Sequence, residues 1–277
     1  TLIAATEDDW TSLISKTGHR VKLRKALEAW KEKGGKGGAD PAEASVVPVQ
    51  NAATTAISAA ARLLDVGEET LEARLPLSGF EKTQIVSFDE AGVPLRAVVT
   101  MLPQFMLSCK DLMRQRAAKL PGGVTFDEAC AISLYTAGWD DYSDSFYFIM
   151  NKLLRAADRS ELTPFYRMLK LIILGFSKLE PFQGTVWRGV KADLSSMYAV
   201  GSKVTWWAFS SCTVDMTALE SDCFLGKSGP RTLFSIVTNH GYNAAPFSWF
   251  VEEAEIVLPP GLTLEVKNAA DMGAGLT

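Results

Sequence analysis

The sequence predicts an α+β fold, in which a block of helices precedes a block of short strands. Apolar residues recur at helical spacing over residues 126–135, 143–157 and 162–179. After Pro181 the pattern changes to short apolar runs separated by Gly, Pro, Asn and Ser, which is typical of strands. Helices grouped before strands favour an antiparallel or mixed sheet. They argue against alternating βαβ units, and so against a Rossmann fold.

Individual strands are expected wherever such an apolar run is bounded by turn residues. The expected strands cover residues 185–188, 203–211, 231–238, 252–258 and 262–267.

Length and charge exclude several classes of protein. The chain has 277 residues, of which 47% are hydrophobic, so it is long enough for one large domain or two modest ones with a sizeable core. Its net charge is −4, from 28 Lys and Arg against 32 Asp and Glu. A mildly acidic chain without a basic block is a poor partner for phosphate backbones, so we expect no nucleic-acid binding. No apolar run approaches the roughly 18 residues of a membrane span, so we expect no membrane contact.

Histidine and cysteine usage predicts that no metal is bound. The two histidines, His19 and His240, do not form a pair at metal-ligand spacing. The four cysteines never form a CxxC motif, and four in a chain of this length do not indicate a disulfide framework. This cysteine usage favours a reducing compartment.

The region before residue 125 is expected to be an extension built from separate pieces. Residues 1–33 are expected to form a helical segment. Its stretches over residues 10–14 and 18–23 resemble the tail of a sterile-alpha-motif domain, and a plain helical lead-in is the alternative. Residues 34–50 contain a glycine-rich run and are expected to be a linker. The remaining pieces are a helix over 51–65, a hairpin of strands 85–88 and 93–100 and a helix over 105–120, all within an extension at 51–124 that precedes the main domain at 125–277.

Two glutamates, Glu253 and Glu255, are candidates for chemistry. Residues two apart on a strand share a face, so the expected strand over 252–258 would point both carboxylates the same way. A half-exposed strand with acidic residues on its outer face is the plain alternative. Two neighbouring carboxylates raise each other's free energy of ionisation, and this cost is tolerated most readily where a cationic group binds.

An arginine and a serine form two further candidate groups. Arg188 ends an apolar strand and is followed by Gly189, an arrangement that suits a phosphate or carboxylate ligand, although an arginine paired with an internal acid is also common. On the expected strand over 203–211, Trp207 and Phe209 would share a face with Ser211. Cys212 lacks a histidine partner in any known signature, so it is expected to be a small packed residue.

In this order, the three groups resemble the Arg–Ser–Glu class of mono-ADP-ribosyltransferases, of the arginine-specific type. The Arg-Gly motif of that family is matched by Arg188-Gly189, and its Glu-x-Glu motif by Glu253-Ala254-Glu255. Its Phe-x-Ser-Thr-Ser motif is matched from Phe209, with Cys212 and Thr213 in place of the last two residues. The helical region matches the family's Tyr-x-x-x-Asn helix at Tyr147 and Asn151. The resemblance covers residues 126–267.

The resemblance implies a split β-sandwich of two small sheets with an N-terminal helical lobe, and NAD as the substrate in the cleft between them. It implies that Arg188 contacts the NAD phosphates and that Gly189 offers backbone hydrogen bonds to the nicotinamide amide. Ser211 would orient Glu255, which would bind the nicotinamide-ribose 2′-hydroxyl. Tyr147, Asn151 and Phe209 would complete the NAD site, and Glu253, Trp249 and Phe250 would meet the acceptor. The two aromatic residues are either exposed anchors for the acceptor or core residues.

The expected activity is transfer of ADP-ribose from NAD to an arginine of a protein acceptor, with release of nicotinamide. A carboxylate at Glu253 suits a guanidinium, because it pairs with the charge and can take a proton. Two alternatives stay open: an NAD glycohydrolase, whose acceptor is water, and an inactive NAD-binding or protein-interaction module. The cysteine positions differ from the disulfides of the family's ecto-enzymes, and a basic-then-apolar leader is absent. We therefore expect a cytoplasmic protein or a secreted or injected effector.

Overall fold

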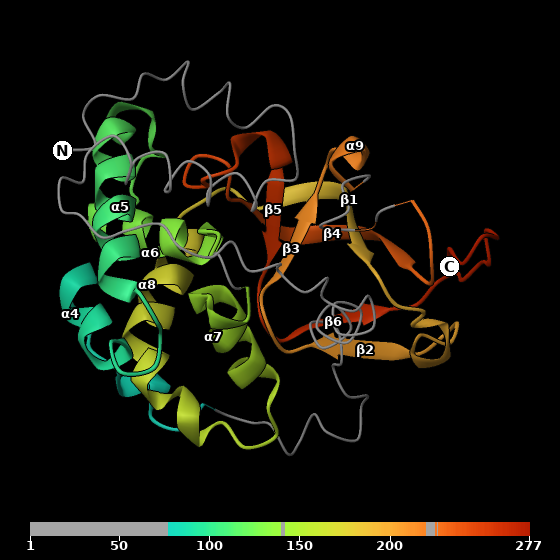
Figure 1. Cartoon of the computed structure of the whole chain (residues 1–277), viewed down its shortest axis with the longest axis horizontal. Coiled ribbons are helices and arrows are strands. Elements are labelled where there is room, and N and C mark those ends of the chain that lie inside the picture. Colours follow the sequence, from blue (N-terminus) through green and yellow to red (C-terminus); the bar gives the residue numbers. More distant parts are fainter. Residues whose placement is uncertain (1–76, 140–141, 220–224, 226) are drawn as a thin grey trace, which may run out of the picture.

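The computed structural model describes residues 77–139, 142–219, 225 and 227–277. The expected helix within 1–33, the linker at 34–50 and the helix over 51–65 lie outside these residues. Figure 1 shows the longer helices gathered on one side of the molecule and the strands on the other, which confirms the predicted α+β arrangement. Within the described part of the chain, none of the helices is long and apolar enough to cross a membrane.

The helical lobe is organised around α6, which begins at a capping box. The Thr125 hydroxyl accepts a hydrogen bond from the Glu128 backbone N–H, and the Glu128 carboxylate accepts one from the Thr125 N–H at 2.8 Å. Every residue from 128 to 135 is buried, because the other helices surround α6. The helices are α4 (Phe88–Gly92), α5 (Leu102–Gln115), α6 (Phe126–Thr136), α7 (Phe146–Arg155), α8 (Tyr166–Ser177) and the short α9 (Met216–Leu219).

Within the part of the chain that the structure describes, six antiparallel strands form two sheets. In the larger sheet β1 pairs with β3 and β4, and β5 closes the sheet between those two. In the smaller sheet β2 pairs with β6. The strands are β1 (Phe182–Val190), β2 (Lys203–Trp206), β3 (Ser210–Thr213), β4 (Thr232–Asn243), β5 (Glu255–Leu258) and β6 (Leu262–Glu265).

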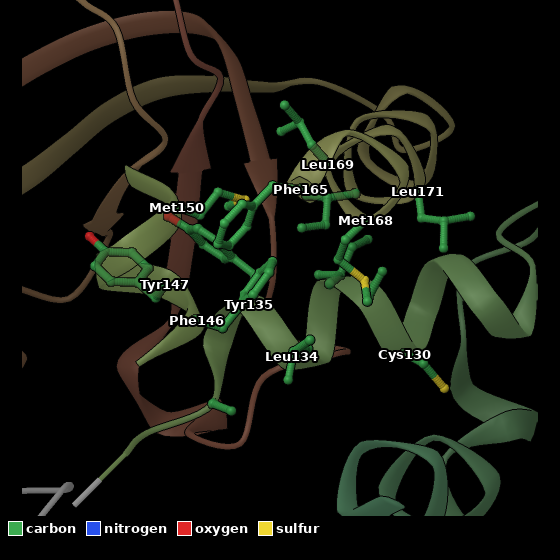
Figure 2. Packing of buried hydrophobic residues seen from close by; sticks show 14 of the residues in the cluster. Cys130, Leu134, Tyr135, Phe146, Tyr147, Met150, Phe165, Met168, Leu169 and Leu171 are labelled. Atoms are coloured by element: carbon green, nitrogen blue, oxygen red, sulfur yellow. The ribbon is translucent and has the colours of Figure 1, made fainter. Parts of the chain in front are cut away.

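The main hydrophobic core crosses from the helical lobe into the larger sheet. Figure 2 shows its packing around α6, with Tyr135, Phe146 and Phe165 from three different segments. Phe209 and Val257, at the edges of β3 and β5, belong to the same cluster. A second cluster of buried hydrophobic residues is formed mainly by side chains of strands from both sheets. The helical lobe therefore sets the position of the nearby strand ends.

The predicted hairpin over residues 85–100 is wrong. The chain instead forms α4 and a 3-10 turn over Val93–Leu95. The reason is local: Ser87 accepts from the Glu90 N–H while the Glu90 carboxylate accepts from the Ser87 N–H, a reciprocal cap that starts a helix. Two of the apolar residues that suggested a strand, Leu95 and Val99, lie four residues apart and are buried against the helical core.

The predicted strand over residues 203–211 is divided in two. Strand β2 ends at Trp206, and the chain joins the other sheet at Ser210 as β3. Between them the Phe209 N–H donates to Asn151 Oδ1 at 3.2 Å, so this backbone is held by α7 and not by a strand partner. Trp207, Phe209 and Ser211 therefore do not share a strand face.

Candidate active site

A cavity lies where the end of α6 and the start of α7 meet strands β1, β3 and β5. The residues that resembled family motifs come together in its wall, although they are far apart in the sequence. Six lining side chains carry the argument below: Tyr135, Tyr147, Arg188, Ser211, Glu253 and Glu255.

Arg188 contributes a fixed positive charge to the cavity wall. Its side chain is only 5% exposed, and its Nη1 donates to the Ser211 carbonyl at 2.6 Å. Burial is the largest single influence and acts to lower the pKa of this guanidinium, but Tyr147, Cys212 and Tyr135 together raise the pKa above its usual value, so the group stays charged. Among the described residues, no hydrogen-bond partner is found for its Nε. A buried donor of this kind fits an anionic ligand.

Gly189 lets the chain pack closely beside Arg188. A Cβ added at this position would lie 2.7 Å from the Leu225 Cβ, which is closer than real side chains approach. Gly189 itself lines the cavity. Any larger residue would push β1 away from Leu225 and shift the strand that carries Arg188.

Ser211 and Tyr135 connect β3 to the helical lobe. The two hydroxyl oxygens lie 3.4 Å apart, and Ser211 pairs with Val257 on β5. Burial raises the pKa of Tyr135 well above its usual value, and Tyr147 and Glu255 add to this effect, so the phenol stays protonated. Figure 2 shows Tyr135 and Tyr147 projecting from α6 and α7. Tyr135 ends the helix that was expected over residues 126–135, and it was not among the residues expected to hold NAD.

The two glutamates border one cavity, but not for the reason expected. Glu255 is the first residue of β5 and is 7% exposed. Glu253 ends a 3-10 turn, η9 (Val251–Glu253), and Ala254 between them has a left-handed backbone with φ 45°. The predicted strand over 252–258 is therefore wrong at its start, and the two carboxylates do not share a strand face. A turn brings them together.

Thr213 holds that turn, and sequence analysis missed its role. Its hydroxyl donates to the Glu253 carbonyl at 2.7 Å and accepts from the Asp215 N–H at 2.9 Å. In the sequence Thr213 stood out only as a replacement for the last serine of the family motif. The feature of the sequence that could have indicated this role is the hydroxyl group at position 213, which Thr213 shares with the serine of the family motif.

The segment before Glu253 is fixed to the helical lobe. Arg116 Nη1, at the end of α5, donates to the Ser248 carbonyl at 2.7 Å. Phe247 and Ser248 are fully buried, Phe250 is 6% exposed, and Trp249 packs against the main core. Of the two interpretations, the structure favours core residues, since Phe250 is nearly buried and Trp249 is partly buried against the core, while Phe250 also lines the cavity.

Replacing Arg116 with alanine should lower the free energy of unfolding by about 1–3 kcal/mol. The cost arises because the buried Ser248 carbonyl loses its donor. Urea denaturation of the full chain measures the difference. Arg114→Ala is the matched control, since Arg114 makes an exposed ion pair with Asp111 and a distant contact with the Phe126 ring at 5.9 Å, and its loss should cost under about 1 kcal/mol. Equal losses for both variants would contradict the role given to Arg116.

Asn151 and Phe209 lie behind the cavity wall. Asn151 is 1% exposed and its side-chain oxygen accepts from the Phe209 N–H. The Phe209 ring packs between Tyr135 and Phe176, at centroid distances of 5.3 and 6.2 Å. Among the residues expected to hold NAD, these two support the wall, while Tyr147, Arg188, Gly189 and Ser211 line it.

Cys212 should not act as a nucleophile. Burial raises the pKa of its thiol to about 12, against the opposing effect of Arg188, so the thiol stays neutral below about pH 11. We expect iodoacetamide at pH 8 to leave Cys212 unlabelled in the folded protein, and Cys212→Ser to retain nicotinamide release from NAD. Mass spectrometry of the folded and the urea-unfolded chain locates the label. Inactivation that accompanies labelling of Cys212 would contradict this assignment.

The donor set within the described residues does not suit a metal ion. No group of three or more His, Cys, Asp or Glu side chains in this part of the chain could hold one. The cavity instead combines a buried guanidinium, two carboxylates and hydroxyl groups. This set suits an anionic ligand next to a reaction that develops positive charge.

Comparison with known proteins gives the same family as the motifs. The family of NAD:arginine ADP-ribosyltransferases matches residues 104–276. No curated protein matches the chain. Among solved structures, a mutant of the eukaryotic mono-ADP-ribosyltransferase ART2.2 in complex with NAD is 15% identical, covers 78% of this chain and 89% of its own, and has a TM-score of 0.51.

Two bacterial proteins are also similar. HopU1 of Pseudomonas syringae pv. tomato is 19% identical, covers 84% of this chain and 97% of its own, and has a TM-score of 0.47. The Vis toxin of Vibrio splendidus is 21% identical, covers 73% and 87%, and has a TM-score of 0.43. The ART2.2 likeness shows the fold. Because the family match spans more than half of the chain, this protein belongs to the NAD:arginine ADP-ribosyltransferase family, whose members use NAD as substrate.

Proposed function

We propose that this protein transfers one ADP-ribose group from NAD to an arginine side chain of a protein acceptor, and releases nicotinamide. The family and the fold give the reaction class, an NAD-dependent ADP-ribosyl transfer. The arginine acceptor is the finer part of the proposal. The observation that carries it is the pair of glutamates, Glu253 and Glu255, on one cavity that also contains Arg188.

The residues at the cavity fit NAD as a substrate. Arg188 presents a buried, charged guanidinium whose Nε has no partner among the described residues, and NAD carries two phosphates. Gly189 lines the same cavity and has no side chain, so a ligand can approach its backbone closely, which supports hydrogen bonds to the nicotinamide amide. Tyr147 adds an aromatic ring to the same wall. In this proposal Arg188 binds the phosphates and Ser211 orients Glu255.

Glu255 would act when the bond between ribose and nicotinamide breaks. Positive charge then develops on the ribose, and a fixed carboxylate stabilises that charge more than it stabilises the uncleaved substrate. Glu255 is suited to this because it is nearly buried, in surroundings where a charge is weakly screened by water.

Glu253 would act on the acceptor. It is more exposed than Glu255. Two hydrogen bonds fix its backbone: its N–H donates to the Phe250 carbonyl, and its carbonyl accepts from the Thr213 hydroxyl. A carboxylate in this position can pair with a guanidinium and remove its proton as the new bond forms. The alternative of an inactive module is disfavoured because Arg188, Ser211, Glu253 and Glu255 all border one cavity.

The proposal is tested by identifying the modified atom. The full chain is incubated with isotope-labelled NAD and either agmatine, a small guanidine compound, or a mixture of proteins, and the products are analysed by mass spectrometry with electron-transfer fragmentation. We expect an ADP-ribose adduct on agmatine and on arginine side chains. Nicotinamide release with free ADP-ribose as the only product would overturn transfer. Adducts confined to other side chains would overturn arginine as the acceptor.

A further inference from the structure

Phe250 is nearly buried in the cavity wall and Trp249 is partly buried against the core, so neither ring is the exposed apolar surface beside Glu253. The exposed apolar residue next to Glu253 is Val251, which is 50% exposed at the start of the same turn. It is too exposed to contribute to the core, and it lies between Phe250 and Glu253, which both line the cavity.

A second segment lies at the same edge. Thr213 ends β3 and pairs with Glu255 at the start of β5, so the chain that leaves β3 and the chain that enters β5 are at one end of the sheet (Figure 1). The Thr213 hydroxyl joins them through the Glu253 carbonyl. Just beyond it, Val214 and Met216 are 39% and 48% exposed. Leu219 of α9, in the same segment, lines the cavity.

The charges along these two segments have one sign. Neither residues 211–219 nor residues 247–258 contain a lysine or an arginine. Asp215, between the two apolar residues, accepts hydrogen bonds from the Thr217 N–H and hydroxyl, which lower the pKa of its carboxyl and keep it charged. With Glu253, the rim therefore combines carboxylates with exposed apolar side chains.

We propose that Val214, Met216 and Val251 form a docking rim that selects acceptor segments in which an apolar residue lies next to the target arginine. This inference rests on the proposed function, since Glu253 is taken to receive the guanidinium. The carboxylates attract the cationic segment, and the rim buries the neighbouring apolar side chain. An acidic acceptor segment would be repelled by Glu253 and Asp215.

The test compares acceptors that differ only beside the arginine. Two peptides of equal length carry one arginine, flanked by leucines in one and by serines in the other, and agmatine serves as an acceptor without flanking residues. For the wild-type full chain we expect kcat/KM for the leucine peptide to exceed that for the serine peptide by about tenfold. The double variant Val214→Ser, Val251→Ser should lose most of this preference and keep its activity on agmatine.

Val237→Ser is the matched control, because Val237 is 82% exposed on β4, where it pairs with Thr185 of β1 and not with either rim segment. It should keep the wild-type preference for the leucine peptide. Equal use of the two peptides by the wild type, or an unchanged preference in the double variant, would overturn the docking rim while agmatine modification upholds the proposed function. Nicotinamide release without modification of any of the three acceptors would overturn both.

Discussion

Replacing Glu255 with glutamine should reduce nicotinamide release by about a hundredfold to a thousandfold, the cost typical of losing one electrostatic stabiliser of a transition state. Glutamine keeps the size of the side chain at this nearly buried position and removes only its charge. Because the charge matters as the ribose bond breaks, kcat should fall while the affinity for NAD changes little. Steady-state release of nicotinamide and equilibrium binding of NAD measure the two effects separately.

Two further variants serve as comparisons for Glu255→Gln. Glu265→Gln makes the same chemical change on β6, where Glu265 pairs with Lys267 at the surface, and should leave activity unchanged. Arg188→Ala should instead weaken NAD binding itself, since a phosphate contact exists before the reaction begins. Near-normal turnover by Glu255→Gln would rule out the role assigned to this carboxylate.

Replacing Glu253 with glutamine should separate transfer from hydrolysis. Transfer to an arginine acceptor should fall by about 10²–10⁴-fold, as is typical when a general base is lost. Hydrolysis of NAD should survive, because Glu255 and Arg188 are unchanged and water does not require a partner for a guanidinium charge. Nicotinamide release is measured with and without agmatine, for the wild type and the variant.

The possible outcomes for Glu253 are distinct. If both activities collapse, Glu253 takes part in breaking the ribose bond. If neither changes, the assignment of arginine as the acceptor is wrong. A loss of transfer alone supports the division of work between the two glutamates on either side of Ala254.

The sequence predicted the order of helices and strands well, because that order depends on periodicity and turn residues along the chain. It failed where a contact distant in sequence decides the local structure. Asn151 accepts the Phe209 N–H and so ends the run that was expected to be one strand. The hairpin expected around residue 90 failed for a different reason, since the Ser87–Glu90 cap was present in the sequence and was overlooked.

The sequence predicted several residues that line the candidate cavity, but it missed Tyr135 and Thr213 and did not predict the geometry. Motif spacing was enough to select Arg188, Ser211 and the two glutamates. It did not show that Ala254 would take a left-handed backbone, because that conformation is held by the Thr213 hydroxyl, 40 positions away from the Glu253 carbonyl that it binds. Arg116 was missed for a similar reason, since it fixes the backbone of a loop more than 130 positions later and belongs to no motif.

If Arg188 binds NAD and Glu253 receives the acceptor, as proposed, their different depths should give the two substrates different sensitivities to ionic strength. Arg188 is 5% exposed, so dissolved ions screen its attraction for an anion only weakly. Glu253 and Asp215 are at the rim, where the Debye length of about 8 Å at physiological ionic strength limits their reach toward an approaching cation. Added salt should therefore weaken capture of the acceptor before it weakens capture of NAD. The share of NAD consumed by water instead of by an acceptor would then rise with salt, so the surrounding medium itself would influence which product the enzyme makes.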